Sequence, residues 1–382
     1  MSNHLFNQQF EKLYQQPAQA MSTAPGRVNI IGEYTDFNNG FVLPCALTFA
    51  TRVLYRKRDD NNVVVHSLNY PGERDEFSLD GDIPHGDSQW GNYIRAVAFV
   101  FKRQGHSLCG VDLLIDSNVP QGSGLSSSAA LEVAIGGVFN QVSELNLSTT
   151  AIALLGQEAE NDFMNCQCGI MDQLISANGE LGHALQIDCQ SLATESVPIP
   201  EDLSIVIVNS NYPRKLVDSE YNQRREDCEQ AAQIMSVTTL RDATMTILNA
   251  ARDKLTVNQF KRAHHVISEN IRVLAATNAL KNNDMNALRE LMTASHLSLK
   301  NDFEVTVPAT DGLVEICQQA LGSNGAVRMT GGGFGGAIVC LCRARDVEKI
   351  ELAVEQHYFN RFNLHASIYV CKAGGGLTVI EI

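Results

Sequence analysis

The sequence predicts a two-domain α+β protein in which sheets are covered by helices. Its 382 residues exceed the size of one typical hydrophobic core. Residues 24–67 have the pattern of antiparallel strands around the hairpin tripeptide Asn38-Asn39-Gly40, whereas residues 210–321 are mainly helical. No repeat or low-complexity linker marks a boundary between the domains. We place them at residues 1–182 and 183–382, with the last strand returning to the N-terminal domain.

Periodicity predicts the elements of the N-terminal half. Apolar residues that recur at i, i+3, i+4, i+7 and i+8 indicate helices, and alternating ones indicate strands. We expect helices at residues 5–14, 90–101, 129–142 and 149–165. We expect strands from residue 24 and at residues 49–58, 63–67 and 111–116, with 63–67 beside 49–58 in the sheet. Trp90, the only tryptophan, is interpreted as a core anchor, with the mouth of an adenine pocket as the alternative.

The C-terminal half predicts a sheet under a solvated layer of helices. Strands are expected at residues 183–188, 203–209, 326–330, 337–342 and 366–371. The second of these is almost continuously apolar and should be central in its sheet. Helices are expected at residues 210–235, 257–280, 285–299, 311–321 and 347–359.

The charge balance limits the possible partners. Lysine and arginine number 29, and aspartate and glutamate 43, which gives a formal net charge of −14 at pH 7. We therefore expect neither nucleic acid nor a membrane surface as a partner. The first 19 residues have no basic segment followed by an apolar core, and no stretch approaches the roughly 20 apolar residues of a membrane span. The protein should be cytoplasmic, with its ten cysteines as reduced thiols.

A Gly/Ser-rich stretch, Pro120–Ala129, lies between a predicted strand and a predicted helix and has the features of a phosphate cradle. Gly122 and Gly124 allow close approach of the backbone to an anion. The serines can cap the helix, whose N-terminus favours negative charge. No lysine follows the second glycine, so this is not a Walker A loop. An ordinary capped turn would look the same, so both interpretations stay open for this stretch alone.

Other stretches favour phosphoryl transfer. Gly331–Gly336 holds five glycines in six residues, which is expected only where backbone turns sharply or approaches a ligand. Carboxylates occur together with an arginine in the polar motifs, at Glu33, Asp36, Glu160, Asp172 and Arg27. Phosphoryl transfer needs positioning and charge neutralisation, which such groups supply. Taken singly, Asp172 has a structural interpretation as a helix-start carboxylate, Arg27 as half of an ion pair, and Glu160 as part of a solvated helix face.

Three motifs resemble those of the GHMP small-molecule kinases. Pro120–Ala129 is similar to their phosphate loop, and Gly331–Gly336 to their third motif. The stretch Gly26–Asp36 resembles the signature of the galactokinases within that family, and the similarity continues through Cys168–Gln173 and Ser219–Asn222. The resemblance spans nearly the whole chain, with the motifs in the family's order. It implies an N-terminal domain like domain 2 of ribosomal protein S5, a ferredoxin-like C-terminal domain, and an active site in the cleft between them.

The resemblance also implies a reaction and roles for residues. The reaction is ATP-dependent phosphorylation of the anomeric hydroxyl of α-D-galactose, with Mg²⁺, by a monomer. Asp172 would be the catalytic carboxylate and Arg27 its partner. The sugar would lie along Glu33, Tyr34, Thr35, Asp36, Gly169 and Tyr221. The ATP would contact Ser67, Gly122, Ser123, Gly124, Leu125, Ser126, Ser127 and Ser128. The Mg²⁺ would be held by Ser128 and Glu160.

The sequence departs from the galactokinase pattern at two positions. Tyr34 stands where histidine is common, and Phe37 where tyrosine is usual. A phenol can donate to a sugar hydroxyl but is bulkier than an imidazole. Two alternatives therefore stay open: a kinase for N-acetylgalactosamine or a pentose, and a sensor that binds galactose and ATP without turnover.

Overall fold

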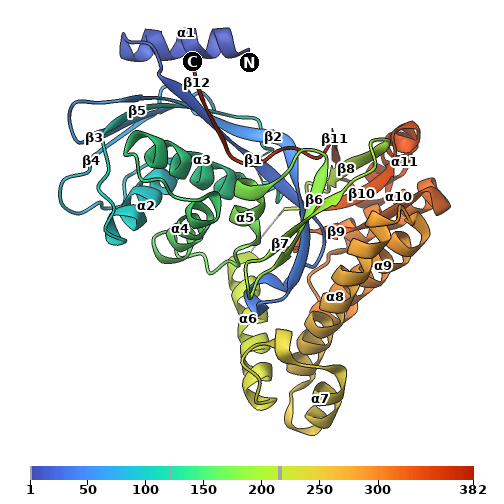
Figure 1. Cartoon of the computed structure of the whole chain (residues 1–382). Coiled ribbons are helices and arrows are strands. Elements are labelled where there is room, and N and C mark those ends of the chain that lie inside the picture. Colours follow the sequence, from blue (N-terminus) through green and yellow to red (C-terminus); the bar gives the residue numbers. More distant parts are fainter. Residues whose placement is uncertain (1, 121, 214–216) are drawn as a thin grey trace.

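A computed structural model describes residues 2–120, 122–213 and 217–382 of the chain. Gln121 of the predicted cradle, and residues 214–216 of the helix predicted at 210–235, lie outside the described residues. Two sheets, of eight and four strands, organise the described part and are flanked by helices (Figure 1). Both termini lie near helix α1 (Asn3–Tyr14) at one end of the molecule (Figure 1).

The larger sheet carries the N-terminal motifs. Its main path is, in spatial order, β12 (Thr378–Glu381), β1 (Ala20–Ile31), β2 (Phe41–Lys57), β5 (Val111–Ser117), β3 (Asn62–Ser67) and β4 (Arg74–Ser78). Off this path, β6 (His183–Asp188) pairs with β2, and β7 (Thr194–Pro198) pairs with β6. The last strand, β12, is antiparallel to β1.

Strand alternation decides which side of the larger sheet each element covers. In β5, Leu113 and Ile115 belong to the core under the helices, whereas Leu114 points to the other face and packs with Phe6 and Phe10 of α1. The helices on the first face are α2 (Gln89–Arg103), α3 (Ser127–Val142), α4 (Thr149–Asp162) and α5 (Met171–Asn178) (Figure 1). The starts of α3 and α5 lie in the predicted site motifs.

The smaller sheet has the order β11 (Ser367–Cys371), β8 (Leu203–Asn209), β10 (Ala337–Arg343) and β9 (Gly325–Thr330), all antiparallel. β8 is buried along its whole length and lies inside the sheet, as its apolar sequence predicts. One face packs on α10 (Pro308–Leu321) and α11 (Val347–Phe362). The other shares a core with α8 (Val257–Lys281), α9 (Met285–Ser298) and strands β1 and β2. The remaining helices, α6 (Val217–Ile234) and α7 (Met245–Ala250), pack on α8 and extend away from both sheets (Figure 1).

The predicted order of strands is wrong at one place. Residues 63–67 were expected beside 49–58, but β5 lies between β2 and β3 and pairs with β3 in parallel. The crossover helix α2, between β4 and β5, permits this parallel pair, because parallel neighbours need a long connection. Local alternation shows that a segment is a strand but not which strand it pairs with. Strands β4, β7 and β12 and helix α7 lie outside the stretches predicted from periodicity.

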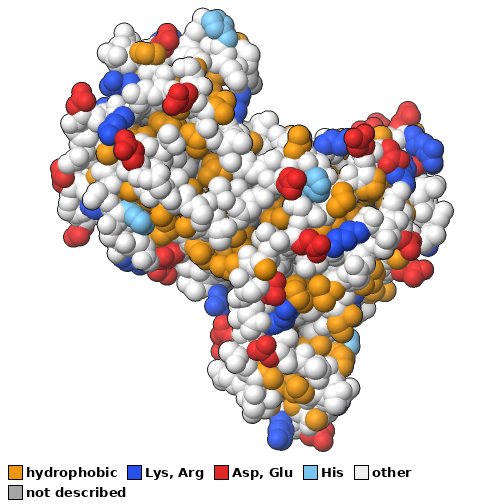
Figure 2. Space-filling view, in the orientation of Figure 1, with side chains coloured by type: hydrophobic (Ala, Val, Ile, Leu, Met, Phe, Trp, Pro, Cys, Tyr) orange, Lys and Arg blue, Asp and Glu red, His pale blue; other side chains and the backbone are white. Residues whose placement is uncertain are grey.

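The surface agrees with the acidic composition. On the face shown in Figure 2, Lys and Arg side chains are scattered among acidic ones and do not gather in one patch. No helix among the described residues is long and apolar enough to cross a membrane.

A buried ion pair joins the two sheets. The side chain of Arg328 in β9 is 0% exposed, and its Nη1 donates to the carbonyl oxygen of Ile30 at the end of β1 (3.0 Å). Its Nη2 lies 2.8 Å from Oε2 of Glu33, which is 3% exposed. Taking two charges out of water is costly, so each partner depends on the other.

Replacing Arg328 should therefore destabilise the protein strongly. The variant Arg328→Met keeps the bulk but leaves Glu33 buried without its cation, and we expect a loss of about 3–5 kcal/mol in the free energy of unfolding. Urea titration followed by circular dichroism measures it. The matched control is Arg343→Met on β10, whose partner Asp202 is largely exposed, with an expected loss under about 1 kcal/mol. Equal losses in both variants would contradict the role given to the buried pair.

Candidate active site

The turn that follows β1 is built around buried hydrogen bonds. Gly32 has φ +106°, and an added Cβ would lie 2.9 Å from the carbonyl oxygen of Phe41, so only glycine fits there without strain. Thr35 is 0% exposed, and its hydroxyl contacts the carbonyl oxygens of Gly32 (2.8 Å) and Phe41 (2.6 Å). Thr35 thus braces the turn that presents its neighbours.

The carboxylate of Glu33 ties this turn to the glycine-rich loop after β9. Its Oε1 accepts from the Gly331 backbone N–H (2.7 Å) and the Thr330 hydroxyl (3.0 Å), and its Oε2 accepts from the Asn29 amide (2.5 Å). With the Arg328 ion pair, both oxygens are held by protein groups. Burial raises the pKa of Glu33, and Arg328 opposes that effect.

Arg27 and Asp172, 145 residues apart, form a bidentate pair. Arg27 Nε lies 2.7 Å from Asp172 Oδ1, and Nη2 lies 2.6 Å from Oδ2. Arg27 Nη1 also donates to the carbonyl oxygen of Gly124 (2.7 Å) in the predicted cradle. The backbone N–H of Arg27 donates to the carbonyl oxygen of Leu125 (3.1 Å). The arginine therefore fixes the start of α5 and the cradle relative to β1. Such fork-to-carboxylate pairs are strong and directional.

The cradle differs from the sequence prediction in its serines. Ser126 stands at the N-cap position of α3, but its side chain makes no cap bond, and its φ of +58° is left-handed. Its hydroxyl donates to Asp172 Oδ2 instead. The Ser123 hydroxyl turns back to the Pro120 carbonyl oxygen (2.5 Å). The helix start is thus left without a serine cap, which leaves its N–H groups available to an anion.

A cavity of about 410 Å³, which we call the Asp172 cavity, brings together most of the predicted sugar residues. It lies where the glycine-rich loop of the smaller sheet faces α4, α5 and the turn after β1. Its lining includes Arg27, Glu33, Tyr34, Asp36, Glu160, Gly169, Asp172, Tyr221, Gly331 and Gly332. Thr35 is not part of the lining, because its side chain points into the turn.

Charges in the Asp172 cavity act on one another. Burial, together with the negative charge of Asp172, raises the pKa of Asp36 to about 6. Burial also raises the pKa of Tyr221, so its hydroxyl stays protonated and can donate. Gly169 lies so close to the Asp36 carboxylate that a Cβ would overlap it. The glycine therefore lets Asp36 sit against the backbone of this segment.

Tyr34 fills one wall of the same cavity with an aromatic ring. Its φ is +66°, which is unusual for a tyrosine, and its hydroxyl donates to the Gly332 carbonyl oxygen (2.6 Å). The ring centroid lies 4.4 Å from that of Phe303 and 5.3 Å from that of Tyr221. An imidazole at this position would be too small to make all of these contacts.

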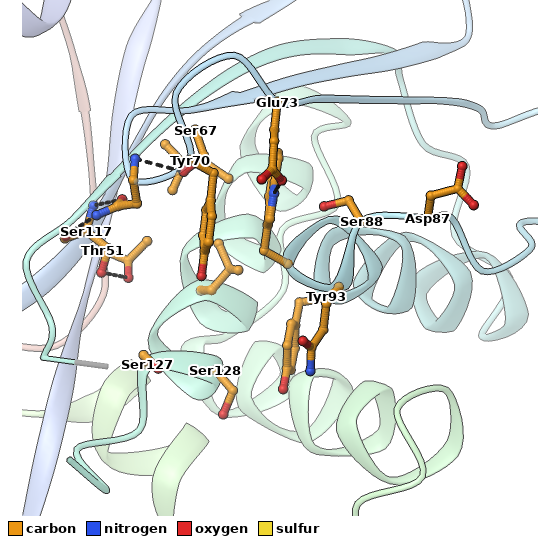
Figure 3. A pocket seen from close by; sticks show the side chains of 15 residues that line it. Thr51, Ser67, Tyr70, Glu73, Asp87, Ser88, Tyr93, Ser117, Ser127 and Ser128 are labelled. Carbon is orange, nitrogen blue, oxygen red and sulfur yellow. Dashed lines mark hydrogen bonds between the residues drawn. The ribbon is translucent and has the colours of Figure 1, made fainter. Parts of the chain in front are cut away.

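A second cavity, of about 480 Å³, adjoins the first, and Gln89 and Tyr93 line both. We call it the serine cavity, because Ser67, Ser88, Ser117, Ser127 and Ser128 line it (Figure 3). Trp90 is 9% exposed; it belongs to the core, as predicted, and also lines this cavity, whereas its place beside an adenine stays a prediction. Its ring stacks on Tyr70 at 5.9 Å, and its N–H donates to Glu73 (2.7 Å).

Ser128 and Glu160, the predicted metal ligands, are brought together from two helices. The hydroxyl of Ser128 hydrogen-bonds the carboxylate of Glu160, which is 8% exposed. Burial, with the negative charge of Asp172 nearby, raises the pKa of Glu160. No group of three or more His, Cys, Asp or Glu with metal-binding geometry occurs in the described ranges. A hydroxyl and one carboxylate suit Mg²⁺, which keeps waters and phosphate oxygens as further ligands.

Three residues that hold this site together were not predicted: Arg328, Glu132 and Gln173. Arg328 supports Glu33, whereas Gln173 donates from Nε2 to both Glu132 (3.0 Å) and Glu160 (2.7 Å). The available signal was a single charged residue within an apolar run, as in Ala326–Thr330 and Ala129–Val142. Such charges are expensive to bury and so need a partner.

Comparisons with known proteins agree with this geometry. Residues 92–180 match the GHMP kinases N terminal domain, and residues 276–360 match the GHMP kinases C terminal domain. Residues 8–57 match the galactokinase galactose-binding signature. The fold is also similar to that of Methanococcus jannaschii mevalonate kinase (TM-score 0.62, 16% identity, covering 94% of this chain and 99% of that one). The matched domains and the fold thus indicate a GHMP kinase.

A nearer relative narrows the class. The structure of Lactococcus lactis galactokinase complexed with galactose has a TM-score of 0.93 and 35% identity, covering 98% of this chain and 99% of that one. The chain therefore belongs to the galactokinases of the GHMP kinase family.

The electrostatics of the Asp172 cavity can be tested directly. In Asp172→Asn the negative charge beside Asp36 is removed while burial is kept, so the pKa of Asp36 should fall below about 6. Carboxyl chemical shifts of ¹³C-labelled aspartate, followed against pH, report it. Asp302→Asn serves as the control and should leave the titration of Asp36 unchanged. An Asp36 that titrates identically in Asp172→Asn would mean that burial alone sets its pKa.

Proposed function

We propose that this protein is an ATP-dependent galactokinase, which phosphorylates the anomeric hydroxyl of α-D-galactose to α-D-galactose 1-phosphate, the first committed step of galactose use. One observation carries the proposal: the Arg27–Asp172 pair links the galactose-binding signature to the cradle, and it lines the Asp172 cavity, which adjoins the serine cavity. One cavity suits a polyol and the other a nucleotide. The 35% identity to a galactokinase supports galactose as the acceptor.

In this proposal galactose occupies the Asp172 cavity. Asp36 accepts from ring hydroxyls, Tyr221 closes the cavity from α6, and Gly169 provides the backbone wall beside Asp36. Glu33 and Tyr34 bind the sugar together with the glycine-rich loop, to which both are hydrogen-bonded. Thr35 supports the turn from inside.

ATP occupies the serine cavity with its phosphates toward the cradle. Backbone N–H groups of Gly122, Ser123, Gly124 and Leu125, with the start of α3, face the phosphates. Ser126 and Ser127 complete the cradle, and Ser67 lies at the nucleotide end of the cavity. Ser128 and Glu160 would hold Mg²⁺, which offsets the charge of the phosphates when it is bound.

The chemical step is an in-line transfer. The anomeric hydroxyl donates to Asp172, its oxygen bonds to the γ-phosphorus of ATP, and the bond from that phosphorus to the β-phosphate oxygen breaks to release ADP. The hydroxyl proton passes to Asp172 and then to solvent. Arg27 orients Asp172 through the bidentate pair, and its positive charge offsets charge on the transferred group. Because the transition state is loose, positioning contributes more than proton abstraction.

The remaining properties of the protein follow from the same proposal. The enzyme works as a cytoplasmic monomer, with domains at residues 1–182 and 183–382, and strands β6, β7 and β12 of the second stretch complete the sheet of the first. The Arg328–Glu33 ion pair joins the two sheets beside the proposed sugar site.

A substrate panel tests the proposal. ADP formation by the purified protein should depend on galactose and be at least tenfold weaker with N-acetylgalactosamine or arabinose at equal concentration. A coupled pyruvate kinase and lactate dehydrogenase assay measures it. Negligible turnover of galactose, with or without turnover of another sugar, would overturn the proposal.

The role of Asp172 is separable from sugar binding. In Asp172→Ala we expect kcat to fall by at least 10²-fold, because the hydroxyl loses its acceptor and Arg27 its partner. Galactose affinity, measured by isothermal titration calorimetry, should change by less than about fivefold. Glu315→Ala on α10, which removes an exposed ion pair with Arg361, is the control and should retain normal kcat. Substantial galactose-dependent ADP formation by Asp172→Ala would contradict the assignment.

A further inference from the structure

Glu132 is a carboxylate in an unfavourable place. It lies in α3 among Ala129, Ala130, Val133 and Ala134, all buried, and is itself 1% exposed. Its Oε2 accepts from Gln173 Nε2 (3.0 Å), and its Oε1 has no hydrogen-bond partner within the described residues. A leucine would be less costly at this position, since a buried carboxylate with an unpaired oxygen is strongly penalised. A residue kept at such a cost points to a role outside stability.

The contacts of Glu132 belong to a chain of hydrogen bonds through four side chains. Gln173 Nε2 is shared between Glu132 Oε2 (3.0 Å) and Glu160 Oε2 (2.7 Å). Glu160 is hydrogen-bonded by the Ser128 hydroxyl. Both ends of this chain, Glu132 and Ser128, lie on α3, four residues apart and on the same face of that helix. The hydrogen-bond chain therefore connects α3, α4 and α5.

The hydrogen-bond chain fixes the orientation of Glu160 relative to the Arg27–Asp172 pair. Gln173 directly follows Asp172 in α5, so its amide and that carboxylate are carried by the same helical turn. A Cβ on Gly156 of α4 would be in ordinary van der Waals contact with Gln173 Cγ (3.4 Å) and Glu132 Cβ (3.5 Å). Helix α4 therefore packs directly on both side chains. With Gln173 held from one side by Glu132, its N–H is presented to Glu160 from a set direction.

We propose that Glu132 is a positioning residue for the metal site: acting through Gln173, it orients the carboxylate of Glu160 that would bind the Mg²⁺ of ATP. This inference rests on the proposed function, because it assumes a metal at Ser128 and Glu160. Glu132 does not itself bind the metal, because it is 1% exposed and, unlike Ser128 and Glu160, lines neither cavity. The functional group of Glu132 is the oxygen that accepts from Gln173. Glutamine, which keeps an acceptor oxygen, should therefore preserve metal affinity, whereas leucine should not.

The test uses Mn²⁺ in place of Mg²⁺, with a non-hydrolysable ATP analogue and no sugar. Electron paramagnetic resonance of free Mn²⁺ gives its dissociation constant from the protein–nucleotide complex. In Glu132→Leu and in Gln173→Leu the constant should rise about tenfold, as for other groups that orient metal ligands. In Glu132→Gln it should change less than threefold. The double variant should be no worse than either single one, because both break the same contact.

A second measurement distinguishes positioning from structural support. The urea midpoint of Glu132→Leu should equal or exceed that of the parent protein, because a buried carboxyl group with one unpartnered oxygen is removed. Glu158→Leu, on α4 near Glu160 but in an exposed ion pair with Arg103, is the matched control and should bind Mn²⁺ normally.

Three results would overturn the inference. The first is an unchanged Mn²⁺ constant in Glu132→Leu, and the second is equal weakening in Glu132→Gln and Glu132→Leu, which would indicate charge and not orientation. The third is a lowered urea midpoint in Glu132→Leu accompanied by lost galactose binding, which would indicate structural support. Failure of the proposed function is recognised separately, as absence of galactose-dependent ADP formation by the parent protein.

Discussion

The bidentate pair between Arg27 and Asp172 is the contact on which the rest of the site depends. It joins β1 to the start of α5, and a third nitrogen of the arginine binds the Gly124 carbonyl in the cradle. Ser126 adds a bond from the cradle to the same carboxylate. One ion pair thus fixes the distance between the place for the acceptor hydroxyl and the place for the phosphates. For a reaction through a loose transition state, that distance is the main thing a protein can supply.

The second domain takes part through the glycine-rich loop and its buried supports. Glu33 accepts from the Gly331 N–H, and the Tyr34 hydroxyl donates to the Gly332 carbonyl oxygen. Two consecutive residues of the Gly26–Asp36 stretch are thus hydrogen-bonded to two consecutive residues of this loop. Arg328 neutralises Glu33 from the same strand that leads into the loop. These contacts fix the position of the glycine-rich loop relative to Glu33 and Tyr34. The use of tyrosine at position 34 fits this arrangement, because its longer side chain reaches the Gly332 carbonyl.

Local sequence predicted most helices and strands, and most of the residues proposed to bind the sugar line one cavity, but the hydrogen bonds between them could not be predicted. The period of the apolar residues identified α2, α8 and β8, since it depends only on which side is buried. It could not show that β5 separates β2 from β3, because pairing is set by distant segments. The motifs indicated Asp172 and Arg27, whereas Ser126 was expected to cap a helix and instead bonds Asp172. Its left-handed backbone directs the hydroxyl away from the helix, and residue type alone does not reveal that.

In the proposed mechanism, the anomeric hydroxyl of galactose, and no other hydroxyl, attacks the γ-phosphate. Nuclear magnetic resonance of the product formed from ¹³C-labelled galactose and ATP identifies the carbon that carries the phosphate. The phosphorus should couple to the anomeric proton and carbon, with the α configuration. A phosphate attached to any other carbon, or ADP formed without a sugar phosphate, would rule this mechanism out.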